Sequence, residues 1–339
     1  MGLDPNSLRA SLKDSPALET LDLSGLDLEE LDFSGKALRQ IRFAGARLKG
    51  ANFAGTVCRE TDFTGADLST ASFKGADVSE CLFEGANLCG ANLSDATFTR
   101  ADLRDARLCS CACRGTLFRH ANLTGADIAG SDLTGADASG ALFPGLRLDG
   151  AHFHTVNFSK AHLTGAALPG AFFEDCELFL TFLDGADLTQ ARFAACRTAQ
   201  ACFTGAKLTD ARFENAASNH AVFRGADLSR VTLAGDFTGA DFNQAALAGA
   251  DLSGGRFERA FFRQAEATGA RLTDVNFRFA DFSHATLTGA MASRSDFHMA
   301  RLHMIRAQGT DWTDAALLGA RGQDKDLAEA ENWRPKGLV

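Results

Sequence analysis

A large apolar residue recurs every five positions along most of the chain. In residues 61–80, TDFTGADLSTASFKGADVSE, it falls at Phe63, Leu68, Phe73 and Val78, and a small residue stands two positions before each. A period of five fits neither a helix, with a period of about 3.6, nor a strand, with a period of about 2. The pattern therefore predicts a chain that turns a corner every five residues, with the large and small positions both facing inward.

The five-residue frame shifts once. Large residues, here called centres, stand at positions ending in 3 or 8 from Leu23 to Leu233, and the next one, Phe237, follows after only four residues. The new frame then continues through Leu317. We expect one shortened corner near Gly235, inside a single repeat array. Glycines two residues after a centre are expected to take positive φ at the corners.

The repeated segments ADLST, ANLSD, ADLRD, ANLTG, ADIAG and ADLTQ resemble those of the pentapeptide repeat family, whose pattern is A(D/N)LXX. The resemblance covers roughly residues 21–320, which is nearly the whole chain. It implies an all-β fold, a right-handed quadrilateral parallel β-helix with four pentapeptides in each coil. Such a solenoid has about fifteen coils at this length, since each coil uses about twenty residues.

The two ends of an array of this kind need caps, because an open coil exposes unpaired backbone. We expect an N-terminal cap in residues 1–20, with a short helix over 5–14, and the repeats in 21–320. The C-terminal cap is expected in 321–339, with a helix over 326–333. In that helix Asp326 is predicted to be the N-cap, and Leu327 and Trp333 are predicted to form the apolar side.

Charge, cysteine content and hydropathy narrow the classes of partner. The net charge is −9, which argues against direct nucleic-acid binding, because that needs a basic track along the phosphates. Nine cysteines, mostly in small or apolar repeat positions, are expected to be reduced thiols of a cytoplasmic protein. No apolar run has the length of a membrane helix, so we expect no membrane association.

The sequence favours a protein without catalysis. The run CSCAC places Cys111 and Cys113 inward and Cys109 outward, so these thiols are not expected to converge on a metal ion. The eight histidines fall at positions that the frame predicts to be outward. No hydrolase, zinc-protease or nucleotide-binding motif is present. We therefore predict no catalytic residue, no metal and no cofactor.

Large apolar residues also stand at outward positions, above all in the stretch AFFEDCELFLTFLDG at 171–185. Stacking of coils is expected to continue this set as a broken apolar stripe, and a stripe of this size usually marks an interaction surface. The alternatives are a homodimer interface and local packing over small centres. The predicted partner-binding residues are Phe172, Phe179, Leu180, Phe182, Val222, Phe261 and Phe279.

These observations predict a non-enzymatic scaffold or adaptor that binds a protein partner. A first alternative follows from the family resemblance and the acidic first half, namely a DNA mimic that interacts with or protects a topoisomerase such as gyrase. Duplex DNA carries about one charge per 1.7 Å of its length, which is far denser than a net −9. A second alternative is an accessory of bacterial type VI secretion, because the opening ETLDLSGLDLEELDFSG is similar to proteins of that setting.

Overall fold

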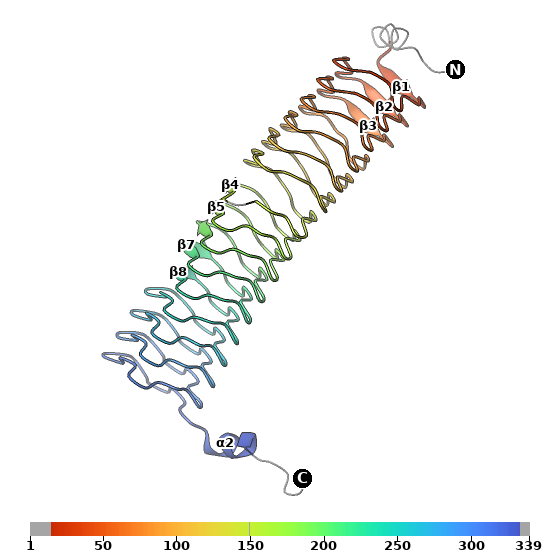
Figure 1. The fold of residues 1–339 in the computed structure, drawn as a ribbon. Helices are drawn as coiled ribbons and strands as arrows, with labels where there is room; N and C mark the ends of the chain where they lie inside the picture. Colours follow the sequence, from red (N-terminus) through yellow and green to blue (C-terminus); the bar gives the residue numbers. More distant parts are fainter. Residues whose placement is uncertain (1–14, 149, 333–339) are drawn as a thin grey trace, which may run out of the picture. The chain divides into compact units, whose positions relative to one another are not determined.

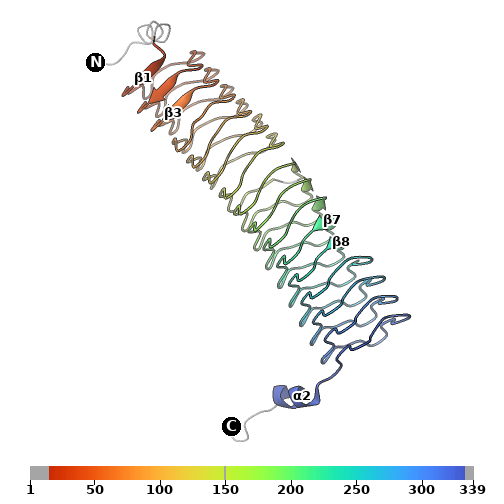
Figure 2. The same cartoon turned by 180° about the vertical axis from the view of Figure 1, so that it is seen from behind.

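The computed structural model describes residues 15–148 and 150–332, and Figures 1 and 2 show the ribbon from two opposite sides. The chain divides into two compact units, residues 1–186 and 187–339. Unit 1 contains β1 (Ala17–Glu19), β2 (Ala37–Arg39), β3 (Val57–Arg59), β4 (His152–His154) and β5 (Phe172–Glu174). Unit 2 contains β6 (Arg192–Ala194), β7 (Arg212–Ala217), β8 (Thr232–Asp236) and the helix α2 (Lys325–Asn332).

Each unit is a parallel β-solenoid whose coils use twenty residues, except where the frame shift of unit 2 shortens the spacing by one, as between Val222 and Asp241. In unit 1, β1, β2 and β3 pair in parallel with partners twenty residues apart, and β4 pairs with β5 in the same way. Elsewhere single bridges repeat this spacing, as between Asp67 and Asn87. The backbone N–H of Leu68 donates to the carbonyl oxygen of Asn87 at 2.7 Å, and such bonds join one coil to the next. The all-β fold and the four pentapeptides per coil were predicted correctly.

A tight turn closes most of the pentapeptides. The N–H of Ala66 donates to the carbonyl oxygen of Phe63 at 3.0 Å, and the turn residue Gly65 has a φ of 63°. A β-turn of this type requires a positive φ at its third residue, as predicted for the corner glycines. Many of the turns use a non-glycine residue there, including Leu180 with a φ of 55°. Asp62 supports its turn by accepting the N–H of Thr64 at 2.9 Å.

The centres fill the inside of each coil. In unit 1, Phe43 and Phe63 stack with ring centroids 5.1 Å apart, and Phe63 also meets Phe53 edge-on at 5.5 Å. Their side chains are fully buried, and so are most alanines of the small position. Repeated stacked and edge-on contacts between rings hold the coils in register from the inside, because both arrangements are favourable for aromatic rings.

The frame shift lies in unit 2, where β7 and β8 pair. The register changes between Glu214 and Ala216, so that Ala216 lies opposite Gly235. Gly235 has a φ of 155°, and a Cβ added there would lie 2.2 Å from the carbonyl oxygen of Ala216. Only glycine fits a backbone approach this close. The shortened corner is therefore located at Gly235, where the sequence frame shifts.

The C-terminal helix differs from its prediction at its start. Residues 325–332 form α2, and the N–H of Leu327 donates to Asp324 Oδ1 at 3.1 Å. The N-cap is therefore Asp324 and not Asp326, since a cap side chain accepts the N–H two or three residues later. Leu327 is exposed whereas Ala328 is buried, so Leu327 was placed wrongly on the covered side. The predicted helix over 5–14 and the predicted role of Trp333 lie outside the described residues.

Candidate functional site

In unit 1, Phe182 is an exposed aromatic residue held in place by the preceding coil. It follows Leu142 and His162 in one column of bridged residues. The Phe182 side chain is 38% exposed, and its ring stacks on His162 with centroids 4.5 Å apart. Leu180, at the turn just before it, is half-buried. Because the stack limits the motion of the ring, a partner that covers Phe182 loses little further side-chain entropy on binding.

Phe172 and Phe179 lie on other walls of unit 1. Phe172 pairs with His152 between β5 and β4, and the two rings stack at 4.8 Å. With four five-residue walls in a coil, residues ten apart lie on opposite walls, so Phe172 and Phe182 face opposite directions. Phe179 lies on the wall between them and is half-buried. The structure thus brings Leu180 next to Phe182 but does not place Phe172 on the same surface.

In unit 2, charged residues interrupt the column that contains Phe261. Val222, Asp241, Phe261 and Asp281 are successive bridged residues of that column. Phe261 is 45% exposed, whereas Val222 is half-buried. Asp241 lies between them and accepts a hydrogen bond from the Arg224 guanidinium at 2.6 Å. Phe261 therefore lies between two carboxylates, and Asp241 separates it from Val222.

Phe279 occupies a turn position of unit 2 and is 42% exposed. The Cζ atoms of Arg259 and Arg278 lie 5.4 and 5.9 Å from its ring centroid. A guanidinium at this distance is attracted to the face of an aromatic ring. Phe279 is therefore an exposed ring held by two cations.

Sequence reasoning missed several exposed apolar residues near the C-terminal end of unit 2. Met299 stands one coil after Phe279 in the same turn position, which the twenty-residue spacing would have revealed. Leu318, at 75%, has the most exposed side chain among the large apolar residues that the structure describes. The other members of this set are Met291, Met304 and Leu317.

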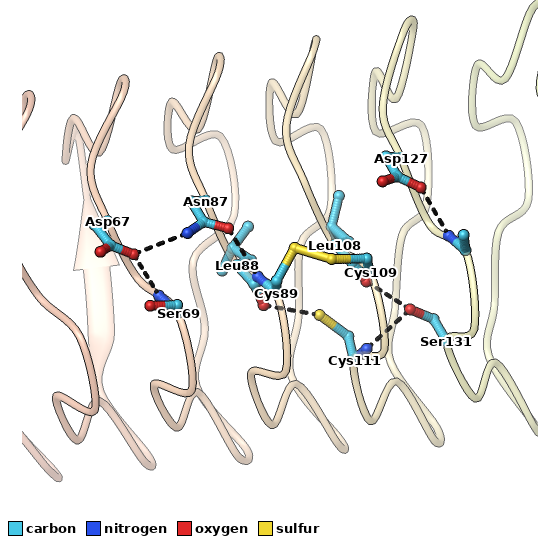
Figure 3. Close-up of a disulfide and its surroundings, with 11 residues drawn as sticks. Asp67, Ser69, Asn87, Leu88, Cys89, Leu108, Cys109, Cys111, Asp127 and Ser131 are labelled. Atoms are coloured by element: carbon cyan, nitrogen blue, oxygen red, sulfur yellow. Dashed lines mark hydrogen bonds between the residues drawn. A yellow bond between two sulfur atoms is a disulfide. The ribbon is translucent and has the colours of Figure 1, made fainter.

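The prediction that all nine cysteines are reduced thiols is wrong for two of them. Cys89 and Cys109, which stand outward on successive coils of unit 1, form a disulfide with their Cα atoms 4.6 Å apart (Figure 3). Six of the seven free cysteines are buried, and the seventh, Cys202, is partly exposed. Burial raises the pKa of the Cys81 thiol to about 12. Cys81 is therefore a packing group, and Cys89 and Cys109 are an oxidised pair.

Acidic and basic residues neutralise each other along the walls of unit 1. Arg47 lies 3.4 Å from Asp27 and 2.6 Å from Glu29, and Arg119 lies 2.6 Å from Asp137. Exposed pairs of this kind add little stability each. They do, however, break up any continuous run of negative charge on these walls.

A cluster of two histidines and one carboxylate joins α2 to the coils of unit 2. His284 Nε2 lies 3.2 Å from Glu331 Oε1, and His303 Nε2 lies 3.3 Å from Glu331 Oε2. Burial acts to raise the pKa of Glu331, but the hydrogen bonds from both histidines hold it below its usual value. His303 is only 5% exposed, so the prediction that every histidine faces solvent was wrong there. Spacing could not reveal this cluster, since Glu331 lies outside the repeats.

The fold and the stacked walls define a repeat solenoid that presents side chains outward. A family model described as pentapeptide repeats matches more than half of the chain, and the chain belongs to this family. Its eight matches cover residues 41–79, 71–108, 101–137, 131–166, 157–193, 201–235, 234–266 and 270–303. A search of curated proteins found no match. Among the described residues, no helix has the length and apolar character needed to cross a membrane.

Solved structures of family members are similar to this chain. HetL, a pentapeptide repeat protein involved in heterocyst differentiation regulation in Nostoc sp. strain PCC 7120, is 19% identical over 94% of this chain and 96% of its own, with a TM-score of 0.26. Rfr23 from Cyanothece 51142 is 20% identical over 38% of this chain and 94% of its own, with a TM-score of 0.29. QnrB1, a plasmid-mediated fluoroquinolone resistance protein, is 19% identical over 46% of this chain and 78% of its own, with a TM-score of 0.29 in a trypsin-treated form.

Proposed function

We propose that this protein is a non-enzymatic scaffold that binds a protein partner through exposed aromatic rings on its coil walls. The observation that carries the proposal is that Phe182, Phe261 and Phe279 are each more than one third exposed. Stacking on His162 holds the first ring, and two arginines hold the last. Aromatic side chains that are already ordered are typical anchors of protein interfaces.

The test compares outward residues inside and outside this set. The double variant Phe182→Asp with Phe261→Asp is expected to keep the fold, because both side chains point away from the core. Leu82→Asp with Met291→Asp is the matched control, since these side chains are 44% and 43% exposed. We would capture binding proteins from the source lysate with wild type and both variants, and identify them by mass spectrometry.

A partner that is lost with the phenylalanine variant and retained with the control supports the proposal. Equal capture by all three proteins contradicts it. Sedimentation of the purified protein distinguishes a different protein partner from the homodimer alternative, in which the captured partner is the chain itself. A topoisomerase among the retained partners would point to DNA mimicry, although the Arg47 and Arg119 ion pairs count against that function. Recovery of secretion components would favour the accessory role.

A cytoplasmic location is part of the proposal, and the seven free cysteines support it. The Cys89–Cys109 disulfide argues in the other direction, because such bonds persist mainly in oxidising compartments. Thiol labelling of the protein in freshly lysed cells decides between the two. Labelling of Cys89 and Cys109 supports the cytoplasm, and their protection from the label contradicts it.

A further inference from the structure

The cluster of His284, His303 and Glu331 has three convergent ligand atoms from separate parts of unit 2. His284 is a turn residue with a φ of 63°, and its N–H donates to the carbonyl oxygen of His303 in the next coil at 2.8 Å. Glu331 comes from α2 and reaches both rings. The three ligand atoms all lie within 4.8 Å of one another. This combination of two imidazoles and one carboxylate is a common ligand set for zinc.

The spacing of the ligand atoms supports this interpretation. A tetrahedral zinc ion with bonds of about 2.0–2.1 Å separates neighbouring ligand atoms by about 3.3 Å. Each imidazole nitrogen has its own oxygen of Glu331 at a similar spacing, with Oε1 3.2 Å from His284 and Oε2 3.3 Å from His303. The two histidine rings have centroids 5.3 Å apart, and their ligand nitrogens must move closer together to bind one ion with the carboxylate.

The cluster also opens onto solvent on one side. Glu331, His284 and Met304 line a groove of about 630 Å³ along the coil wall. Arg224 and Arg263 line the same groove, and Arg224 is already paired with Asp241. We propose that His284, His303 and Glu331 bind a divalent transition metal ion, with zinc as the best match, and that a water molecule completes the shell from the groove.

Metal binding requires a proton shift on His303. The N–H of Asp324 donates to His303 Nδ1 at 3.0 Å, so without metal the ring proton is on Nε2 and points to Glu331. When a metal ion binds Nε2, the neutral ring carries its proton on Nδ1 instead. Nδ1 then no longer accepts a hydrogen bond, so the Asp324 amide must move away. Residues 322–324 are exposed and have no regular structure, so this movement disturbs no strand. The ion therefore replaces the two hydrogen bonds of Glu331 with coordinate bonds and removes the Asp324–His303 hydrogen bond, which alters the start of α2.

The test uses the full chain with its disulfide intact. We would titrate zinc chloride by calorimetry, and record the absorption spectrum with Co²⁺ to identify the ligand type. We expect one ion per chain, with affinity at least about tenfold weaker in Glu331→Gln and in His284→Ala, a loss of about 1.4 kcal/mol. His220→Ala is the matched control, because His220 is also a turn residue but lies outside the cluster. Its affinity is expected to equal that of the wild type.

Two further readouts separate this site from the alternatives. The Co²⁺ spectrum is expected to show no thiolate charge-transfer band, and a strong band would assign the ion to free cysteines and overturn the proposal. Hydrogen exchange of the Asp324 amide is expected to accelerate with zinc, because its acceptor is lost. Absence of saturable binding, or equal binding in Glu331→Gln, would show that the cluster only fastens α2 by hydrogen bonds.

Discussion

Phe63 and Phe182 are the same residue type in the same unit, but one is buried and the other is exposed. Phe63 is a centre, fully buried between Phe43 and Phe83 with ring centroids 5.1 and 4.7 Å away. Phe182 stands one position before its centre, is 38% exposed and stacks on His162. The difference teaches that the position within the pentapeptide, and not hydrophobicity, decides whether a side chain supports the fold or faces solvent.

The strongest way to test this comparison is to truncate both rings. Phe63→Ala is expected to lower the free energy of unfolding by about 3–5 kcal/mol, because it leaves a cavity among stacked rings. Phe182→Ala is expected to cost less than about 1 kcal/mol, since its site is open to solvent. Urea denaturation followed by circular dichroism measures both. Similar losses for the two variants would mean that Phe182 is a packing residue.

The second prediction concerns an outward position that does stabilise the coils. Reduction of the Cys89–Cys109 disulfide is expected to lower the stability by about 3 kcal/mol, because the bond closes a loop of twenty residues. The melting temperature with and without reductant measures this effect. In Cys89→Ser the reductant should change nothing, while Cys202→Ser should behave as wild type. Two extra reactive thiols in the native oxidised protein would show that the bond is not formed.

Much of the fold could be predicted because each pentapeptide repeats the same pattern of large, small and turn residues. Large residues such as Phe63 and small ones such as Ala66 fixed the inward face, and the corner glycines fixed the turns. The frame shift at Phe237 indicated where the backbone shortens. The cap of α2 was misplaced by two residues, because Asp324 and Asp326 are equally good cap residues in sequence and only the path of the chain separates them.

The third prediction compares two glycines of unit 2. Gly235→Ala is expected to cost about 1–3 kcal/mol, since its φ of 155° suits only glycine and the new Cβ would meet Ala216. Gly225→Ala is expected to cost about 1 kcal/mol, because its φ is 63° and no atom lies within 4 Å of the new Cβ. Thermal melting of both variants gives the comparison. A larger loss at Gly225 would mean that the shortened corner can relax.

The candidate sites were less predictable than the fold. Outward positions of Phe182, Phe261 and Phe279 followed from the frame, and the structure shows all three exposed. Whether they bind a partner stays a prediction. The disulfide was missed although the predicted coil of twenty residues places Cys89 and Cys109 on neighbouring coils, because all nine cysteines were assigned to reduced thiols. The cluster at His303 was missed because it depends on where α2 folds back.

The smallest expected effect concerns Asp137, which occupies the same position before a centre as Phe182. Its carboxylate accepts the N–H of Ser139 at 3.0 Å and lies 2.6 Å from Arg119. Burial acts to raise the pKa of Asp137, but these bonds outweigh it and hold the pKa below the usual value. A folded-state pKa below the unfolded one contributes stability at neutral pH, and this is lost as the pH falls through about 4 and below.

Asp137→Asn should therefore make stability depend less on pH between about 7 and 3, while its neutral side chain still accepts the Ser139 amide. Urea denaturation of wild type and variant at both pH values measures the difference, and an unchanged pH dependence would contradict the assigned shift. Asp22→Asn is a control for the contribution of the arginine. The pKa of Asp22 is also lowered, but mainly by its bond with Ser24 and less by Arg42. Phe182 makes no such bond to its turn, since a phenyl ring has no acceptor for an amide. The chain thus gives up at Phe182 a stabilising contact that it uses at Asp137, which is the pattern expected where a wall position serves binding.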